Sequence, residues 1–267
     1  RLKRRPGELI PSHSRLNQLL EPILFVRHKR VALLFTKEVY MRTNLTISIL
    51  TLLTGLTLQA ATAAQDLTTL LTKTKDVSTD AVIVYKDGQV IYEMYANDYK
   101  PTTKHLSWSM GKTISGVMIG QAVEDGLFGY DTKVKNYFPK LTADATVLDF
   151  LKMGSGVKFS EVYSGLPVDA DVTKMLYTFG PTVGFADYVT SLPARIEVPG
   201  QHYYYSSGDT NVLMGVLQKS LNNQKTYNTY PWKKFFSPLC IKNVTFEQDT
   251  KGTFIGSSYI YMSAPDY

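Results

Sequence analysis

The alternation of hydrophobic and polar positions predicts a β-hairpin in the first part of the folded region. Apolar residues fill much of two runs, 81–86 and 89–95, which are joined by Asp87-Gly88. Asp-Gly is preferred in two-residue hairpin turns because both positions must accept a positive φ. Residues 66–71 predict a short helix before this hairpin.

Helical spacing of apolar residues becomes clear after residue 109. Five of these residues indicate one buried helix face: Ile114, Val117, Met118, Ala122 and Val123. Residues 146–149 fit a capping box that opens a short helix, which stops at residue 154. Ser206 can cap a further helix over 210–221. The intervening residues 154–199 are rich in loops and predict small helices along one wall of a cleft.

The first 64 residues predict a leader rather than part of the fold. Residues 1–40 have no convincing period, and charged residues split their two apolar runs, which excludes a membrane span there. A short basic start at Met41, an uncharged run and small residues near Ala64 match a secretory signal peptide. We therefore expect an upstream non-domain segment at 1–40, a signal peptide at 41–64 and one domain at 65–267. The protein would be periplasmic or secreted, with no stable membrane anchor.

The basic charge of the chain does not indicate a nucleic-acid partner. The net charge is +6 over 267 residues, but residues 1–42 hold ten Lys/Arg and three Asp/Glu. The other 19 basic and 20 acidic residues nearly balance, so no polyanion partner is expected for the body. Cys240 is the only cysteine, which excludes a disulfide within the chain, and only His105 and His202 follow the leader. We expect no metal and no organic cofactor.

Ser109 and Lys112 have the spacing S-x-x-K at the start of the clearest predicted helix. Residues three apart on a helix share a face, so the hydroxyl and the amine can meet. A serine hydroxyl becomes a good nucleophile when an adjacent base takes its proton, and a desolvated lysine can be that base. The alternative is that Lys112 lies at an exposed helix end and extends its amine into solvent.

A second candidate segment precedes the predicted helix at 210–221. Tyr205 lies at this loop-to-helix corner, and its phenol can join a proton relay if a cation such as Lys112 lies beside it. The alternative is a structural aromatic corner with Ser206 as the helix cap.

The two segments together resemble the penicillin-recognising serine hydrolases. Ser109-Met-Gly-Lys112 followed by Tyr205-Ser-Ser207 has the order and separation of that family. Four connecting segments are also similar to it: 124–127, 131–139, 147–156 and 199–213. The family includes class C β-lactamases, D-alanyl-D-alanine carboxypeptidases, related esterases and 6-aminohexanoate-dimer hydrolases. The resemblance covers roughly residues 66–267, and the Tyr-Ser-Ser-Gly-Asp form is most similar to the last of these branches.

The resemblance implies an α/β (α+β) fold, in which an antiparallel sheet is flanked by helices and joined to a mostly helical subdomain. It also implies hydrolysis of a small-molecule amide or ester through an acyl-serine. Ser109 would attack the carbonyl, and its backbone N–H would supply half of an oxyanion hole. Lys112 and Tyr205 would move protons, and either could be the acylation base. Ser207 and Trp108 are the candidate substrate-binding residues.

Two departures from the family pattern bear on the substrate and on activity. Class C β-lactamases have Asn where this chain has Ser207, which weakens the case for β-lactams. The family's third motif, Lys or His, then Thr or Ser, then Gly, is absent, since Lys251-Gly-Thr253 has the wrong order. We therefore expect a C-terminal truncation that removes later sheet strands, the second oxyanion donor and part of the substrate floor, which can leave the chain as given inactive. The alternative function is a catalytically inactive cell-wall binding relative, against which the retained Ser109, Lys112 and Tyr205 argue.

Other catalytic motifs fit less well. Gly154-Ser-Gly156 lacks the spacing of a G-x-S-x-G elbow. Gly111-Lys-Thr113 is similar to the end of a P-loop, but Leu106 occupies the position of the first glycine that this motif requires. Lys233 and Lys234, which lie among aromatic residues, predict a solvated face rather than a nucleic-acid patch. A Ser-His-Asp triad that uses His202 remains open.

Overall fold

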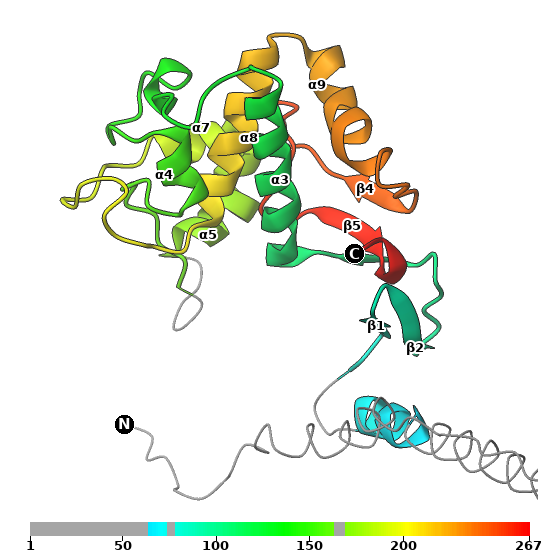
Figure 1. Ribbon diagram of the computed structural model, residues 1–267. Helices are drawn as coiled ribbons and strands as arrows, with labels where there is room; N and C mark the ends of the chain where they lie inside the picture. The colour runs from blue at the N-terminus through cyan, green and yellow to red at the C-terminus, as the bar shows by residue number, and fades with distance from the viewer. Residues whose placement is uncertain (1–63, 74–77, 163–168) are drawn as a thin grey trace, which may run out of the picture. The chain divides into compact units, whose positions relative to one another are not determined.

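The computed structural model describes residues 64–73, 78–162 and 169–267. The predicted upstream segment and the predicted signal peptide as far as residue 63 lie outside the described residues. Within the described ranges, no helix has the length and apolar character needed to cross a membrane. The chain divides into two compact units, and the second of them holds Asn97–Tyr267 together with Ala81–Ile83 (Figure 1).

The first unit contains most of the predicted hairpin. Residues 64–73 are helical, and the strands β1 (Ala81–Lys86) and β2 (Gln89–Tyr95) pair with each other. Asp87 and Gly88 have φ values of 51° and 76°, so both turn residues are left-handed, as the Asp-Gly turn requires. The predictions of the short helix and of the hairpin are confirmed.

The second unit is organised around helix α8 (Ser207–Leu221). Four helices pack against α8: α3 (Gly111–Glu124), α4 (Val147–Leu151), α7 (Phe185–Thr190) and α9 (Gln224–Pro231). All residues of α8 from Ser207 to Leu217 are buried, including the polar ones at its start. A helix enclosed in this way must satisfy its polar groups with protein partners, because water does not reach them.

The capping signals in the sequence correctly mark the starts of two helices. The Thr146 hydroxyl accepts from the backbone N–H of Asp149, and the Asp149 side chain caps the Thr146 N–H in return. Ser206 caps α8 by accepting from the backbone N–H of Asp209 at 3.0 Å. The α8 helix thus starts at residue 207, three residues before the predicted position.

Short helices follow α4 and precede α8, as predicted for the loop-rich stretch. They are α5 (Asp171–Thr173), the π-helical turn η5 (Lys174–Thr178), α6 (Gly180–Val183) and α7. The buried face of α3 contains Ile114, Met118, Ile119 and Ala122. The expectation that Val117 lies on this buried face is wrong, because its side chain is 52% exposed.

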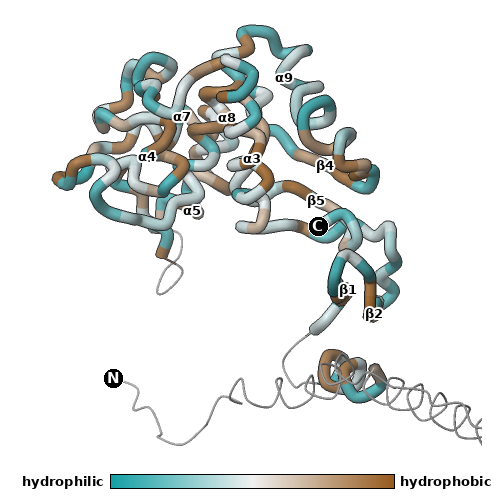
Figure 2. The backbone as a smooth tube through the Cα atoms, in the orientation of Figure 1, coloured by the Kyte–Doolittle hydropathy of each residue, from teal (hydrophilic) through white to brown (hydrophobic). Residues whose placement is uncertain are grey.

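The second unit also contains a small three-stranded antiparallel sheet. Its strand order is β3 (Lys104–Leu106), β5 (Ile260–Ser263), β4 (Val244–Phe246). In the register, His105 and Val244 both pair with Met262. Ile260 and Met262 alternate along β5 and are buried, and Figure 2 shows hydrophobic stretches in β5 and α3. The predicted mixture of antiparallel sheet and helices is confirmed.

The α9 helix and the following π-helical turn η6 (Trp232–Phe236) were not expected from the sequence. Their aromatic side chains cover part of the core: Phe236 meets Phe246 edge-on, and Trp232 lies 5.9 Å from Phe254 between ring centroids. Lys233 and Lys234 are exposed on the other face of the same turn. This part of the chain is therefore a core element with a solvated basic side.

The close approach of α7 and α8 predicts a specific sensitivity at Gly215. A Cβ atom at this position would lie 2.8 Å from both Ala186 Cβ and Phe138 Cζ. Gly215→Ala is therefore expected to lower the free energy of unfolding by about 1–3 kcal/mol through overpacking. Gly116→Ala on α3 is the matched control, because its Cβ would meet nothing within 4 Å. That change should stabilise by about 0.5–1 kcal/mol. Urea denaturation of both variants measures the difference, and equal responses would contradict the packing argument.

Candidate active site

Ser109 and Lys112 lie where the chain enters α3. Ser109 is in the 3-10 turn η2 (Trp108–Met110), and Lys112 is in the first turn of the helix that follows. Lys112 Nζ donates to Ser109 Oγ at 2.9 Å. Ser109 is exposed, whereas Lys112 is partly buried. The two groups that the S-x-x-K spacing was expected to bring together are therefore in direct contact, and the serine oxygen is accessible to a molecule from solvent.

Lys112 has two further neighbours besides Ser109. Its Nζ donates to the backbone carbonyl of Ser257 at 3.1 Å. It also lies 5.0 Å from the centre of the Tyr205 ring, a cation–π distance. Tyr205 comes from the segment just before α8, as predicted, and is 40% exposed. The structure thus places all three predicted catalytic residues at one point on the surface of the second unit.

Trp108 precedes the serine in a strained backbone conformation. Its φ is 43°, in the left-handed region that bulky side chains rarely adopt. The neighbouring Ser107 fixes this conformation: its N–H donates to Ile260 O at 2.7 Å, and its hydroxyl donates to Ser258 O at 2.9 Å. The Trp108 side chain is 50% exposed and contacts Tyr259 edge-on. It is therefore an apolar surface next to Ser109, available for contact with a substrate.

Ser207, the other predicted substrate-binding residue, is buried and bound to Glu161. Its hydroxyl donates to Glu161 Oε1 at 2.7 Å, and its backbone N–H donates to Oε2 at 2.6 Å. The carboxylate therefore sits at the N-terminus of α8, where the helix dipole favours a negative charge. Glu161 could not be predicted from the sequence, because it lies 46 residues before Ser207 in a loop and has no local motif.

Asp209 is a buried carboxyl group within this same helix start. Its Oδ1 accepts from the hydroxyls of Ser155 at 2.8 Å and Ser206 at 3.0 Å, whereas its Oδ2 has no hydrogen-bond partner. The pKa of Asp209 is raised to about 7, chiefly by burial and to a smaller extent by the nearby charge of Glu161, while the hydrogen bonds from Ser155 and Ser206 act in the opposite direction. Asp209 holds Ser206 and hence the backbone that follows Tyr205.

His202 does not form the triad that the sequence left open. It is exposed, and within the described part of the chain it makes no hydrogen bond to Ser109. A Ser-His-Asp triad requires the histidine ring to lie within hydrogen-bonding reach of the serine Oγ. The geometry therefore favours Lys112 over His202 as the partner of Ser109.

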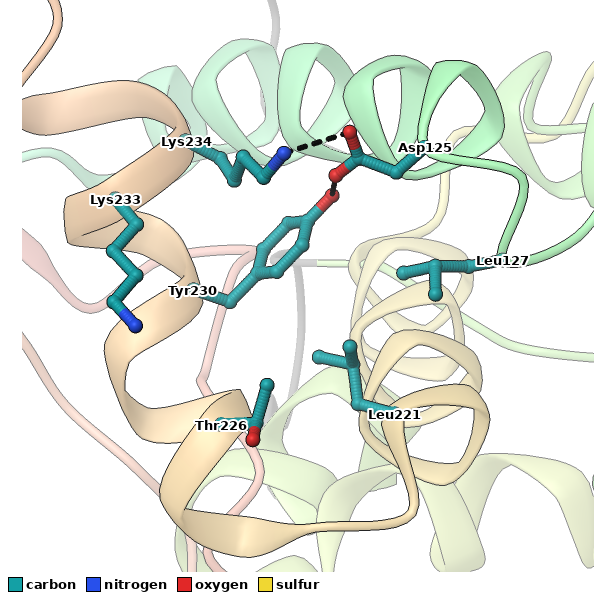
Figure 3. Close-up of a pocket in the computed structure, with 7 residues that line it drawn as sticks. All are labelled: Asp125, Leu127, Leu221, Thr226, Tyr230, Lys233 and Lys234. Atoms are coloured by element: carbon teal, nitrogen blue, oxygen red, sulfur yellow. Dashed lines mark hydrogen bonds and ion pairs between the residues drawn. The ribbon is translucent and has the colours of Figure 1, made fainter.

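A cavity of about 360 Å³ lies away from these residues, between the end of α3, α8 and α9. Figure 3 shows that Asp125 already has two partners there: it accepts from Lys234 Nζ at 2.7 Å and from the Tyr230 hydroxyl at 2.8 Å. The hydrogen bond from Lys234 is the main cause that lowers the pKa of Asp125. None of the predicted site residues lines this cavity.

Comparison with known proteins decides the family. The beta-lactamase family model matches residues 63–266, which is most of the chain. The chain belongs to the beta-lactamase family. The resemblance to the penicillin-recognising serine hydrolases that the two motifs indicated is therefore confirmed.

The chain is similar to a 6-aminohexanoate-dimer hydrolase and to solved structures of class C beta-lactamases. The 6-aminohexanoate-dimer hydrolase of Paenarthrobacter ureafaciens is 25% identical over 177 residues, which are 60% of this chain and 43% of that protein. A Bacillus anthracis protein provisionally named as a 6-aminohexanoate-dimer hydrolase aligns with a TM-score of 0.60 at 19% identity, over 72% of this chain and 53% of its own. A class C beta-lactamase bound to cefoxitin aligns with a TM-score of 0.56 at 16% identity. The alignment covers 78% of this chain and 63% of the beta-lactamase chain. The chain thus spans about half the length of the first two.

The buried carboxyl group of Asp209 predicts a pH dependence of stability. Because its pKa is raised from 3.8 to about 7, the folded protein holds this proton more tightly than the unfolded chain between these values. Stability should therefore fall as pH rises through this window, by up to about 1.4 kcal/mol per pH unit for one proton. Asp209→Asn should remove this part of the slope. Urea denaturation from about pH 4 to about pH 8 measures it.

Asp187→Asn is the control for this experiment, because Asp187 is exposed on α7. Its stability curve should run parallel to that of the wild-type protein. An unchanged slope in Asp209→Asn would show that Asp209 titrates as an ordinary exposed carboxyl group.

Proposed function

We propose that this protein is a serine hydrolase that cleaves an amide or ester bond through an acyl-serine intermediate. The observation that carries the proposal is the 2.9 Å contact between Lys112 Nζ and the exposed Ser109 Oγ. Membership of the beta-lactamase family and the named hydrolases among its relatives also support it. Hydrolysis in this scheme needs neither a metal nor an organic cofactor.

The proposed chemistry starts from Ser109 and Lys112, and Tyr205 offers a second route for the proton. With neutral Lys112, the Ser109 proton passes to Nζ as Oγ attacks the substrate carbonyl. The Ser109 N–H and the start of α3 would stabilise the oxyanion. The proton then passes to the leaving nitrogen or oxygen, either from Lys112 directly or through the Tyr205 hydroxyl, and the bond to the carbonyl carbon breaks. Water releases the acyl group by the reverse route and regenerates Ser109.

Two features guide the choice of substrates for testing. Ser207 stands where class C β-lactamases have Asn, and two of the similar proteins carry the name 6-aminohexanoate-dimer hydrolase. A linear amide oligomer is therefore the first substrate class to test, followed by penicillins, D-amino-acid peptides and short esters. Trp108 offers an exposed apolar surface to the acyl or leaving group.

Covalent labelling of Ser109 tests the proposal. The full chain should react with a fluorescent fluorophosphonate, and peptide mass spectrometry should locate the label on Ser109. Ser109→Ala should abolish labelling. Lys112→Met should slow it by about 100-fold or more, because it removes the general base.

Thr113→Ala is the matched control, since Thr113 is an exposed hydroxyl residue beside Lys112. It should label at the wild-type rate. If the folded wild-type chain reacts with neither the fluorophosphonate nor a penicillin, the hydrolase proposal fails. Sedimentation with purified peptidoglycan would then test the alternative of a catalytically inactive cell-wall binding protein.

We also propose that the protein is periplasmic or secreted, on the evidence of the signal-peptide layout at residues 41–64. Expressed with this segment in a bacterial host, the protein should appear outside the cytoplasm with an N-terminus just after about Ala64. Removal of residues 41–64 should retain it in the cytoplasm. An uncleaved N-terminus on the exported protein would contradict the signal-peptide interpretation.

A further inference from the structure

A buried turn at residues 256–258 lies directly against the segment that carries Ser109 and Lys112. Its three successive backbone carbonyls each accept a hydrogen bond from a side chain of that segment: Gly256 from Ser115 (2.9 Å), Ser257 from Lys112 (3.1 Å) and Ser258 from Ser107 (2.9 Å). The middle carbonyl of this turn therefore holds the amine that contacts the nucleophile. Any movement of the turn would move Lys112 or leave its amine without this acceptor.

Asn211 holds the same turn from the opposite side. It lies on the second turn of α8 and is 1% exposed, and Ser257 is fully buried. The Asn211 Nδ2 donates to Ser257 Oγ at 3.0 Å, and the Ser257 backbone N–H donates to Asn211 Oδ1 at 3.2 Å. Both ends of the amide thus bind one residue, which fixes the orientation of that residue more firmly than one bond could.

We propose that Asn211 is a positioning residue for the reaction, which acts through Ser257 on Lys112. By fixing the turn, it keeps Lys112 Nζ within hydrogen-bonding distance of Ser109 Oγ. Asn211 touches neither Ser109 nor Lys112 in the hydrogen-bond network, so it takes no part in the chemistry itself. This inference rests on the proposed acyl-serine function.

The side chain of Asn211 is chemically suited to this role. The Ser257 N–H requires an acceptor and its hydroxyl can accept a bond, and an amide supplies both an acceptor and a donor in a fixed plane. A leucine of similar size would leave the buried Ser257 N–H without a partner, so the turn would shift to find one. A protonated aspartic acid could make both bonds again.

Stopped-flow hydrolysis of p-nitrophenyl acetate by the full chain tests the proposal, because the initial burst reports acylation separately from binding. In Asn211→Leu, the acylation rate constant should fall by about 10- to 100-fold, as expected when a catalytic group is displaced by about 1 Å. The apparent dissociation constant of the ester should stay within about twofold, since Asn211 is buried out of reach of a molecule from solvent. Asn211→Asp should recover most of the rate.

Thr190→Val controls for a general loss of stability. Thr190 is a buried residue of α7 whose hydroxyl binds Ala186 O at 2.8 Å, without contact to the turn. This variant should acylate at the wild-type rate. Wild-type acylation in Asn211→Leu, or an equal loss in Thr190→Val, would overturn the proposal.

A double-mutant cycle with Lys112→Ala separates positioning from a diffuse structural effect. If Asn211 acts through Lys112, adding Asn211→Leu to Lys112→Ala should change the residual acylation by less than about twofold. If the two substitutions instead reduce the acylation rate independently, so that their fold-changes multiply in the double variant, the proposal is overturned.

Should Asn211→Leu fail to fold, Ser257→Ala decides instead. This variant removes the hydroxyl half of the contact with Asn211 and should slow acylation by about 3-fold or more. A wild-type rate in that variant would also overturn it.

Chemical modification of Lys112 requires no catalysis, so it tests the positioning role of Asn211 separately from the proposed hydrolase function. Acetic anhydride modifies lysine amines, and mass spectrometry can follow Lys112 against the exposed Lys233 in the same chain. Lys112 should react several-fold faster in Asn211→Leu than in the wild-type protein, because its amine is released. If the wild-type chain is not acylated at Ser109, the proposed function fails, while a faster Lys112 reaction still supports the positioning role. An unchanged Lys112 reaction refutes that role.

Discussion

The packing of α3 against α8 is the constraint on which the rest of the site depends. Ser109 and Lys112 lie at the entry to α3 and in its first turn, whereas Tyr205 lies just before α8 and Asn211 lies in the second turn of α8. Because α8 is enclosed by four helices, its first residues cannot move independently of the core. The hydrogen bond between Lys112 and Ser109 is local, but the groups that surround Lys112 come from α8 and from the 256–258 turn.

Two carboxyl groups lie at the start of α8, where the helix dipole stabilises their negative charge but burial destabilises it. Glu161 gains from the dipole and from two donors of Ser207, so its charge has partners. Asp209 has two hydroxyl donors on one oxygen and none on the other, and burial makes its charged form costly. These two carboxyl groups bind Ser207 and Ser206, the two residues that follow Tyr205. The position of the tyrosine therefore depends on how a small buried polar network is satisfied.

Local signals in the sequence predicted the parts of the site that depend on spacing. The S-x-x-K pair, the Ser206 cap and the Asp87-Gly88 turn are each set by a few neighbouring residues, and the structure has all three. The contacts of Glu161 with Ser207 and of Ser257 with Lys112 join residues 46 and 145 positions apart. No periodicity encodes such pairs, because tertiary packing alone brings them together. The α9 helix was missed because its tyrosines and polar residues show no clear apolar stripe.

The surroundings of Lys112 also decide between the two readings that the sequence allowed for it. A lysine that only extends its amine into water would direct its donors outward. Here one donor meets Ser109 Oγ, another meets the Ser257 carbonyl, and the Tyr205 ring lies alongside. These partners replace the water that a partly buried amine loses, and they come from three separate segments of the chain. An amine held in this way against an exposed hydroxyl supports the proton-transfer role that we propose for Lys112, whereas a solubilising lysine would need none of these contacts.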